Sequence, residues 1–251
     1  MDTYLWKLNK GRLNKTNLFS YFNFIKKNYG IDFNNDFNKI WKWSVDNPIF
    51  FWKSIWDFTE VKGSTGNLLF KKSSIFHKNE FFPEAKLNYA ENLLKKNNEE
   101  PAVIFKSENG YKNVLTWKNL TLNVAQISNW MKLNGIKKGD RIAAYLPNIP
   151  ETVTAYISTA ALGAIWSSCS PDFGTNGVIE RFSQIKPKVL IVGEKYFYNG
   201  KEINVLERVP QILKKINSIK YLIIVNYPGQ RYFKKNYKFK KVKTFIWKDI
   251  K

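Results

Sequence analysis

The chain has 251 residues, of which 44% are hydrophobic and 16% aromatic, so its composition excludes an intrinsically disordered protein. Its most apolar uncharged stretch, residues 155–166, is too short to span a bilayer, and the N-terminus lacks the apolar core of a signal peptide. A single cysteine, Cys169, excludes an internal disulfide framework and fits a reducing compartment. We therefore expect a cytoplasmic protein with no membrane partner.

The formal net charge is +21, from 41 Lys and Arg residues against 20 Asp and Glu residues, which raises the question of an anionic partner. Most of the excess is lysine, scattered among many asparagines, as an A/T-biased coding sequence would produce. Arginine is scarce, and no nucleic-acid recognition motif is present. We therefore expect no nucleic-acid partner, although the basic block at 231–243 has interleaved aromatic residues that keep this alternative open.

The first 60 residues are rich in aromatic side chains at helical spacing. A break at 44–48 predicts two separate helices. Such a pattern is typical of a packed helical core rather than of an aromatic ligand site, because large rings at i, i+3 and i+4 bury much area together. The residues that carry the pattern are Phe19, Phe22, Phe33, Phe37, Trp41, Trp43, Phe51, Trp52, Ile55 and Trp56.

The next segments alternate between loops and short elements. Residues 61–82 are expected to form a loop, whose KGSTGN sequence lacks the lysine, strand and helix of a phosphate-binding loop. Residues 81–96 are expected to lead into a helix that ends in lysines. Residues 102–116 predict two strands around a Glu-Asn-Gly turn, and a helix follows from Thr116 to about Gly135.

Residues 139–192 predict the order strand, helix, strand, helix, strand. RIAAYL, AIWSS and KVLIV are short apolar runs that suit buried strands, and VIERFSQI is a helix ended by Pro187. Such alternation implies parallel strands with right-handed crossovers. The fold class is therefore α/β. After a polar loop at 193–205, we expect a helix interrupted by Pro210, a buried strand YLIIV and a weak strand KTFIW.

The starts of the two central helices carry capping signals. Asn148 is the expected N-cap of the first, with Pro150 in its first turn and Glu151 three residues after the cap. Thr175 or Asn176 is the expected N-cap of the second, after the loop SPDFGTN.

The residues alone indicate no catalytic constellation and no metal-ligand spacing. His77 stands in a loop among Lys and Asn, and we expect it to be exposed and non-catalytic. Cys169 lies where a strand meets its following loop, a place where α/β folds put ligand contacts, but a small buried thiol is the simpler interpretation. Asp172 and Glu180 are carboxylates whose spacing does not require them to meet. What remains is a loop site near 169–176.

Three separated motifs resemble the acetoacetate–CoA ligase (acetoacetyl-CoA synthetase) branch of the adenylate-forming acyl-CoA synthetase superfamily. They are WKWSVDNPIFFWKSIWDF at 41–58, FFPEAKLNYAENLL at 81–94, and AALGAIWSSCSPDFG with its sequel ERFSQIKPKVLIV. The sequence SSCSPDFG differs from the corresponding stretch of acetyl-CoA synthetases and resembles that of the acetoacetate branch. The resemblance implies a helical lead-in and connecting segment at 1–96, followed at 97–251 by the first part of the large, mostly parallel-sheet AMP-binding domain.

The resemblance implies a two-step reaction. A carboxylate and ATP give an acyl-adenylate and diphosphate, and the CoA thiol then displaces AMP. In the family the loop that holds the ATP phosphates, the Mg²⁺-binding acid and the adenylation lysine follow beyond the part matched here. We therefore expect an N-terminal fragment that is inactive alone, binds ATP, CoA and Mg²⁺ only weakly by itself, and has no catalytic or metal-binding residue of its own. A separately encoded C-terminal half would be its partner.

In related synthetases the CoA nucleotide contacts the loop that matches Ser170, Pro171 and Asp172, and two basic residues in the loop that matches YNGK. Here Lys201 keeps one positive charge, while Tyr198 stands where the other base would be. The resemblance thus implies CoA contacts by these three loop residues and Lys201. Alternatives are an acetyl- or propionyl-CoA synthetase, or a non-enzymatic basic α/β protein that binds RNA or anionic surfaces through 231–243.

Overall fold

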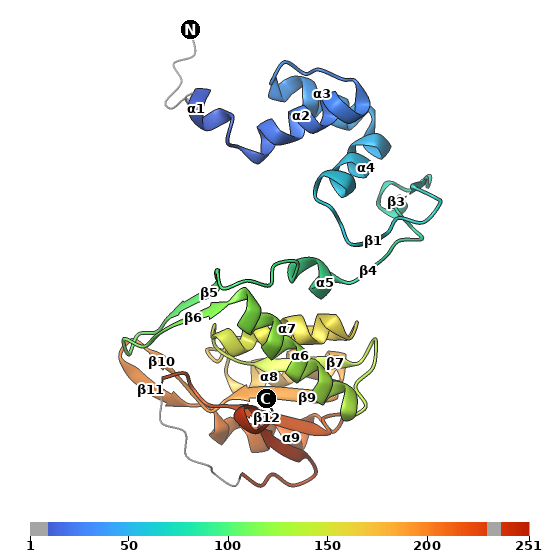
Figure 1. Cartoon of the computed structure of the whole chain (residues 1–251). Coiled ribbons are helices and arrows are strands. Elements are labelled where there is room, and N and C mark those ends of the chain that lie inside the picture. Colours follow the sequence, from blue (N-terminus) through green and yellow to red (C-terminus); the bar gives the residue numbers. More distant parts are fainter. Residues whose placement is uncertain (1–9, 230–236, 251) are drawn as a thin grey trace. The chain divides into compact units, whose positions relative to one another are not determined.

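The computed structural model describes residues 10–229 and 237–250, which form two compact units, Met1–Leu87 and Asn88–Lys251 (Figure 1). The division into units falls between Leu87 and Asn88. The domain boundary after residue 96 stays a prediction. Residues that follow belong to the second unit because the Asn88 Nδ2 donates hydrogen bonds to the carbonyl oxygens of Ala160 and Ala161, at 3.2 and 3.0 Å.

The first unit is mainly helical. Its helices are α1 (Lys10–Leu13), α2 (Asn17–Tyr29), α3 (Phe37–Asp46) and α4 (Pro48–Phe58), and a 3-10 turn spans Phe76–Lys78. Its strands are β1 (Gly63–Ser64), β2 (Phe70–Lys71), β3 (Glu80–Phe81) and β4 (Lys86–Leu87), paired antiparallel as β1 with β4 and β2 with β3. The predicted loop at 61–82 therefore contains short strands, which the sequence did not indicate because each has only two residues.

Aromatic side chains hold the first unit together, as predicted. Its core consists of Tyr21, Phe22, Ile25, Phe33 and Ile40, with Trp43, Phe51 and Ile55 packed against them. The predicted break between two helices is confirmed, because α3 ends at Asp46 and Pro48 begins α4. Phe37, Trp41 and Trp52 of the predicted pattern are instead exposed, at 61, 59 and 44%.

The second unit contains the predicted α/β core. Its helices are α5 (Tyr89–Leu93), α6 (Trp117–Leu133), α7 (Pro150–Ala161), α8 (Thr175–Ile185) and α9 (Val209–Lys215), with 3-10 turns at Leu206–Arg208 and Trp247–Asp249. Its strands are β5 (Pro101–Lys106), β6 (Lys112–Thr116), β7 (Arg141–Tyr145), β8 (Ile165–Cys169), β9 (Val189–Gly193), β10 (Lys195–Tyr198), β11 (Lys201–Asn204), β12 (Tyr221–Val225) and β13 (Lys243–Ile246).

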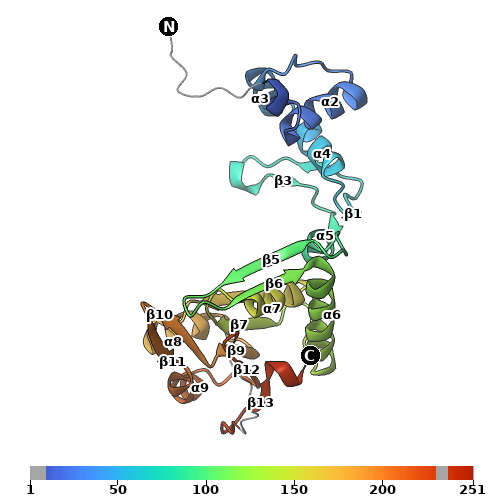
Figure 2. The same cartoon turned by 60° about the vertical axis from the view of Figure 1, so that its left-hand side comes forward.

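Five strands form one parallel sheet in the order β13-β12-β9-β7-β8. Figure 2 shows this sheet between the pair α6 and α7 and the pair α8 and α9. The central strand β9 is buried along its whole length, which explains its uninterrupted apolar sequence. The alternation of strands and helices predicted for 139–192 is thus confirmed.

The strand order changes direction at β7. The chain passes from β7 to β8 on one side, and then crosses to β9 on the other side. The loops after β7 and β9 therefore diverge at the carboxyl ends of these strands, which is where open α/β sheets bind ligands.

Helix α6 begins and packs as its sequence predicts. The Thr116 hydroxyl accepts a hydrogen bond from the backbone N–H of Asn119 at 3.2 Å. The residues of its apolar face, Leu120, Val124, Ile127 and Met131, are all buried.

The predicted caps of the next two helices are wrong. Ile149 is the N-cap of α7, and Gly174 is the N-cap of α8, without side-chain capping in either case. Before α7 the chain turns on itself instead, because the Thr152 hydroxyl donates to the carbonyl oxygen of Pro147 at 2.7 Å. Asn148 is thereby displaced from the cap position.

The predicted polar loop at 193–205 is a hairpin of β10 and β11. Its turn residues Asn199 and Gly200 have φ values of 49° and 70°, the positive values of a tight hairpin turn. Two helices also differ from expectation: α5 is five residues long, with Asn88 as its cap, and Pro210 lies at the start of α9 rather than interrupting it. In the part of the chain that is described, no helix has the length and apolarity needed to cross a membrane.

Candidate functional site

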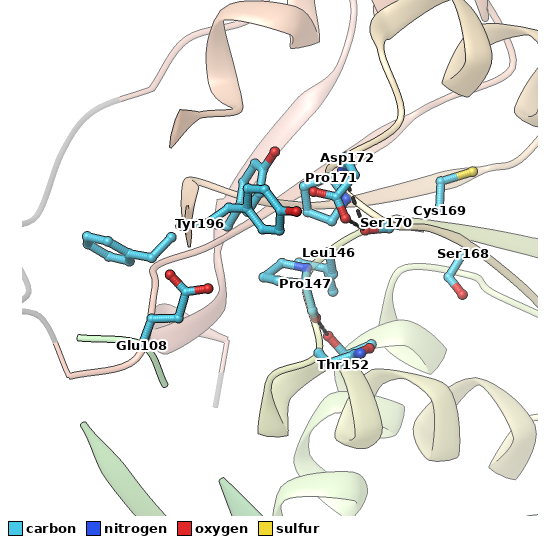
Figure 3. Close-up of a pocket in the computed structure, with 13 residues that line it drawn as sticks. Glu108, Leu146, Pro147, Thr152, Ser168, Cys169, Ser170, Pro171, Asp172 and Tyr196 are labelled. Atoms are coloured by element: carbon cyan, nitrogen blue, oxygen red, sulfur yellow. Dashed lines mark hydrogen bonds between the residues drawn. The ribbon is translucent and has the colours of Figure 1, made fainter. Parts of the chain in front are cut away.

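A cavity of about 400 Å³ lies at the carboxyl ends of β7 and β8 (Figure 3). Five parts of the second unit form its wall. Leu146, Pro147 and Asn148 follow β7, and Thr152 comes from the first turn of α7. Ser168, Cys169, Ser170, Pro171 and Asp172 end β8 and begin its loop. Tyr196, Phe197 and Tyr198 come from β10, and Glu108 from the turn between β5 and β6. The site predicted near 169–176 thus lies at a cavity.

The loop after β8 is ordered by its own side chains. The Ser170 hydroxyl donates to Asp172 Oδ2 at 2.7 Å, and the backbone N–H of Phe173 donates to the carbonyl oxygen of Ser170 at 3.1 Å (Figure 3 draws the first bond). Pro171 is buried, whereas Ser170 and Asp172 are exposed. The loop therefore presents a hydroxyl and a carboxylate to the cavity on a fixed backbone.

Two residues hold this loop from behind. The hydroxyl of the fully buried Tyr145 donates to the carbonyl oxygen of Phe173 at 2.6 Å. Arg208 Nη1 donates to the Tyr145 oxygen and, at 2.8 Å, to the carbonyl oxygen of Pro171. Burial raises the pKa of Tyr145 and outweighs the hydrogen bond and positive charge of Arg208, so the phenol stays protonated and can donate at neutral pH.

The β10–β11 hairpin forms the opposite wall. Tyr196 is almost buried, and burial together with the adjacent Asp172 carboxylate raises its pKa. At the hairpin tip, the backbone N–H of Gly200 donates to Glu108 Oε2 at 3.2 Å. The hairpin is therefore attached to the β8 loop at one end and to the β5–β6 turn at the other.

Lys201 does not line the cavity, unlike the other three residues predicted to contact CoA. It pairs directly with Tyr198 across the hairpin, and directly paired residues present their side chains on the same face of a sheet. Tyr198 lines the cavity and Lys201 is exposed, so Lys201 is a solvent-accessible neighbour of a lining residue, and its contact with CoA stays a prediction.

The cavity itself is acidic. Glu108 and Asp172 are its charged residues, and the described residues contribute no Lys or Arg to its lining. Such a surface favours groups that donate hydrogen bonds and disfavours a phosphate in its interior. Within residues 10–229 and 237–250, no cluster of three or more His, Cys, Asp or Glu side chains is placed to hold a metal ion.

Of the remaining candidates, Cys169 lines the cavity, whereas His77 and Glu180 do not. His77 is exposed in the first unit, as predicted, and Glu180 is exposed on α8 outside the cavity. Cys169 is buried, and its burial raises the pKa of the thiol. The structure therefore agrees with the interpretation of Cys169 as a small buried thiol. Of the basic block at 231–243, residues 231–236 lie outside the described residues.

Sequence reasoning missed Tyr145, Arg208, Tyr196, Asn148 and Glu108. The Asn-Gly pair at 199–200 is a hairpin signal and would have indicated the wall that carries Tyr196. The contact of Tyr145 with Arg208 has no local signal, because the two residues are 63 positions apart.

Comparison with known proteins agrees with this geometry. The family model described as AMP-binding enzyme matches residues 90–247, which is most of the chain. The chain belongs to the AMP-binding enzyme family. The match begins at α5 and covers the whole parallel sheet, so the cavity lies inside the family domain.

Within this family, the chain is similar to acetoacetyl-CoA synthetases. The chain is 37% identical over 225 residues to acetoacetyl-coenzyme A synthetase of Rhizobium meliloti (strain 1021), a match that covers 90% of the chain and 34% of that protein. It is 38% identical over 209 residues to acetoacetyl-CoA synthetase of Xenopus tropicalis, with coverage of 82% and 31%. The structure matches acetoacetyl-CoA synthetase from Streptomyces lividans with a TM-score of 0.88 and 28% identity, over 99% of this chain and 38% of that one. The chain thus spans about a third of the length of these relatives.

Proposed function

We propose that the chain provides the N-terminal part of an ATP-dependent acetoacetate–CoA ligase. The complete enzyme would convert acetoacetate, ATP and CoA into acetoacetyl-CoA, AMP and diphosphate through an acyl-adenylate. The observation that carries this proposal is the match of the chain, cavity included, to acetoacetyl-CoA synthetases in both sequence and structure. It would act on a small carboxylic acid in the cytoplasm.

The cavity would receive the nucleotide end of CoA. The Asp172 and Glu108 carboxylates can accept hydrogen bonds from the exocyclic amine of adenine, while Ser170 can either donate or accept. The acidic interior cannot stabilise a phosphate, but Lys201 beside Tyr198 can, because an ammonium group pairs well with a phosphate in solvent. The base would therefore lie inside and the phosphates outside.

Adenylation needs groups that the described residues do not offer. These residues include no candidate metal cluster, so they do not fit Mg²⁺, and we assign them no step that depends on it. Transfer to ATP also requires stabilisation of the leaving diphosphate by positive groups. We propose that a C-terminal part, in the same polypeptide or separately encoded, provides these groups.

A chimera tests this proposal. This chain would replace the matching third of the Rhizobium meliloti synthetase, and diphosphate release would be measured with acetoacetate, acetate and propionate. We expect the chimera to prefer acetoacetate and the 251-residue chain alone to release no diphosphate. A chimera with native circular dichroism that prefers acetate or propionate would contradict the acetoacetate assignment and favour another short-chain acyl-CoA synthetase.

The same chimera tests Lys201. The substitution Lys201→Glu places a negative charge beside Tyr198 and should raise the KM for CoA about tenfold with little change in kcat, because it removes ground-state binding. Lys106→Glu, an equal charge change in the β5–β6 hairpin, is the control and should leave the KM unchanged. An unchanged KM in the Lys201 variant would remove this residue from the site.

A further inference from the structure

A second cavity, of about 380 Å³, lies between α9 and the segment that leads into β13. Both elements are labelled in Figure 2. None of its lining residues belongs to the cavity at the ends of β7 and β8. We call it the lysine groove. Its volume is within the range of small-molecule sites in proteins.

The floor of the groove is apolar. Pro210 and Leu213 of α9 line one side, and Phe239 lines the other. Leu213 is buried in the core of the second unit, and Phe239 is a half-buried residue packed against that core. The floor is therefore fixed by the core, and it does not depend on the lysines that surround it.

The rim of the groove is strongly basic. Its four remaining lining residues are Lys214, Lys238, Lys240 and Lys241, and no acidic residue lines it in the described part of the chain. Across the chain 41 of 251 residues are Lys or Arg, so a chance set of seven would hold about one. Composition alone therefore does not account for this rim.

The four lysines also lack the partners that other lysines of the chain have. The ion pairs found among the described residues include none of them, although eight lysines elsewhere pair with carboxylates within 3.3 Å. Like charges around one hollow repel each other, and an anion placed among them relieves that repulsion. Lys241 is held with φ at 71°, a left-handed conformation that is strained for lysine.

We propose that the lysine groove binds a medium-chain fatty carboxylate. The alkyl chain would cover Phe239 and Leu213, and the carboxylate would lie among the lysine ammonium groups. A planar membrane surface cannot reach a recessed floor in the same way, and a purely polar anion would leave the floor exposed to water. The apolar floor and the basic rim together therefore favour an amphipathic anion.

Decanoate, below its micelle concentration, is the probe for calorimetric titration of the 251-residue chain. We expect one decanoate per chain, no saturable binding of acetate, and at least tenfold weaker binding of decanol. Lys238→Gln with Lys240→Gln, or Phe239→Ser, should each weaken decanoate binding at least tenfold. Binding of decanoate with no saturation, or acetate bound as tightly, would overturn the proposal.

A matched control separates the groove from general charge attraction. Lys106 and Lys112 are paired across the β5–β6 hairpin, beside the exposed Ile104 and Val114, and neither lysine lines the lysine groove. Lys106→Gln with Lys112→Gln should bind decanoate within about twofold of the wild type. An equal loss in both double variants would overturn the proposal.

Lysine acetylation provides a measurement without substitutions. In the wild-type chain, decanoate should slow acetylation of Lys214, Lys238, Lys240 and Lys241, measured by peptide mass spectrometry, and leave Lys106 and Lys112 unchanged. Uniform rates with and without decanoate would overturn the proposal. Vesicles of phosphatidylglycerol serve as the membrane arm, and protection by vesicles but not by decanoate would assign the groove to a lipid surface instead.

Discussion

The hydroxyl of Tyr145 accepts a hydrogen bond from Arg208 Nη1 and donates one to the carbonyl oxygen of Phe173 at 2.6 Å. Tyr145 ends β7, whereas Arg208 follows the β10–β11 hairpin. The two residues therefore connect both walls of the cavity to the loop that carries Ser170 and Asp172. This arrangement indicates that Arg208 positions the loop, because Arg208 itself does not line the cavity.

Replacement of Arg208 by Met should loosen that loop. It removes the donor to the carbonyl oxygen of Pro171, and we expect it to lower the free energy of unfolding by about 2 kcal/mol. It should also weaken CoA binding. Arg141→Met is the matched control, because Arg141 donates to the carbonyl oxygens of Ile185 and Gly139 at the opposite end of the sheet.

The control should lose similar stability in urea but bind CoA as the wild type does. If both variants weaken CoA binding equally, the effect is one of general stability and Arg208 is not a positioning residue.

Asp140 predicts an acid-sensitive contribution to stability. Burial raises its pKa, but hydrogen bonds from Lys188 Nζ at 2.9 Å and from the backbone N–H of Lys137 outweigh burial, so its pKa is lowered below 3.8. A carboxyl with a depressed folded-state pKa stabilises the fold above its unfolded pKa and loses that contribution as the pH falls through the folded value. Asp140→Asn should therefore cost about 2 kcal/mol at neutral pH.

Urea unfolding from neutral pH down to strongly acidic pH measures this effect. The difference in free energy of unfolding between Asp140→Asn and the wild type should shrink as the pH falls below 3.8. Glu100→Gln, which breaks an exposed pair with Lys96, should stay close to the wild type throughout. If the loss of unfolding free energy in Asp140→Asn does not change with pH, the stabilisation does not come from the ionised Asp140 carboxylate.

Two features favour glycine at position 229: its positive φ and the close approach of the Tyr111 side chain. Its φ is 82°, and a Cβ there would lie 2.4 Å from Cγ of Tyr111. Gly110 has a similar φ of 81° but open space around it. We expect Gly110→Ala to cost about 1 kcal/mol, from backbone strain alone, and Gly229→Ala about 3 kcal/mol. Equal losses in thermal or urea unfolding would show that Tyr111 moves aside freely.

Cys169 is the single thiol of the chain, so its reactivity can be measured without ambiguity. It is 4% exposed, and burial raises its pKa, which lowers the thiolate fraction. We expect a thiol reagent to label the native chain at least 100-fold more slowly than the urea-unfolded chain, since both access and ionisation are restricted. Equal rates would show that the β8 end opens readily.

Local sequence patterns predicted most of the fold. They predicted little of the site, because the site depends on contacts between residues far apart in the sequence. Thr116 and the apolar face of α6 were read correctly because the signals of a cap and a 3.6-residue period are local. The β10–β11 hairpin was missed because Lys195, Glu202 and Lys201 give its strands a polar sequence. The hairpin is held by contacts with distant residues, such as the hydrogen bond from the backbone N–H of Gly200 to the Glu108 carboxylate.

We propose that the cavity beside Ser170 and Asp172 binds the nucleotide end of CoA. Titration of the ¹⁵N-labelled chain with CoA, and with dephospho-CoA as the matched ligand, tests this claim most directly. We expect saturable, weak shifts of the backbone amides at 170–174 and 196–201, with weaker binding of dephospho-CoA because it lacks the phosphate that would pair with Lys201. Shifts confined to other parts of the chain, or no saturable shifts with CoA at all, would contradict it.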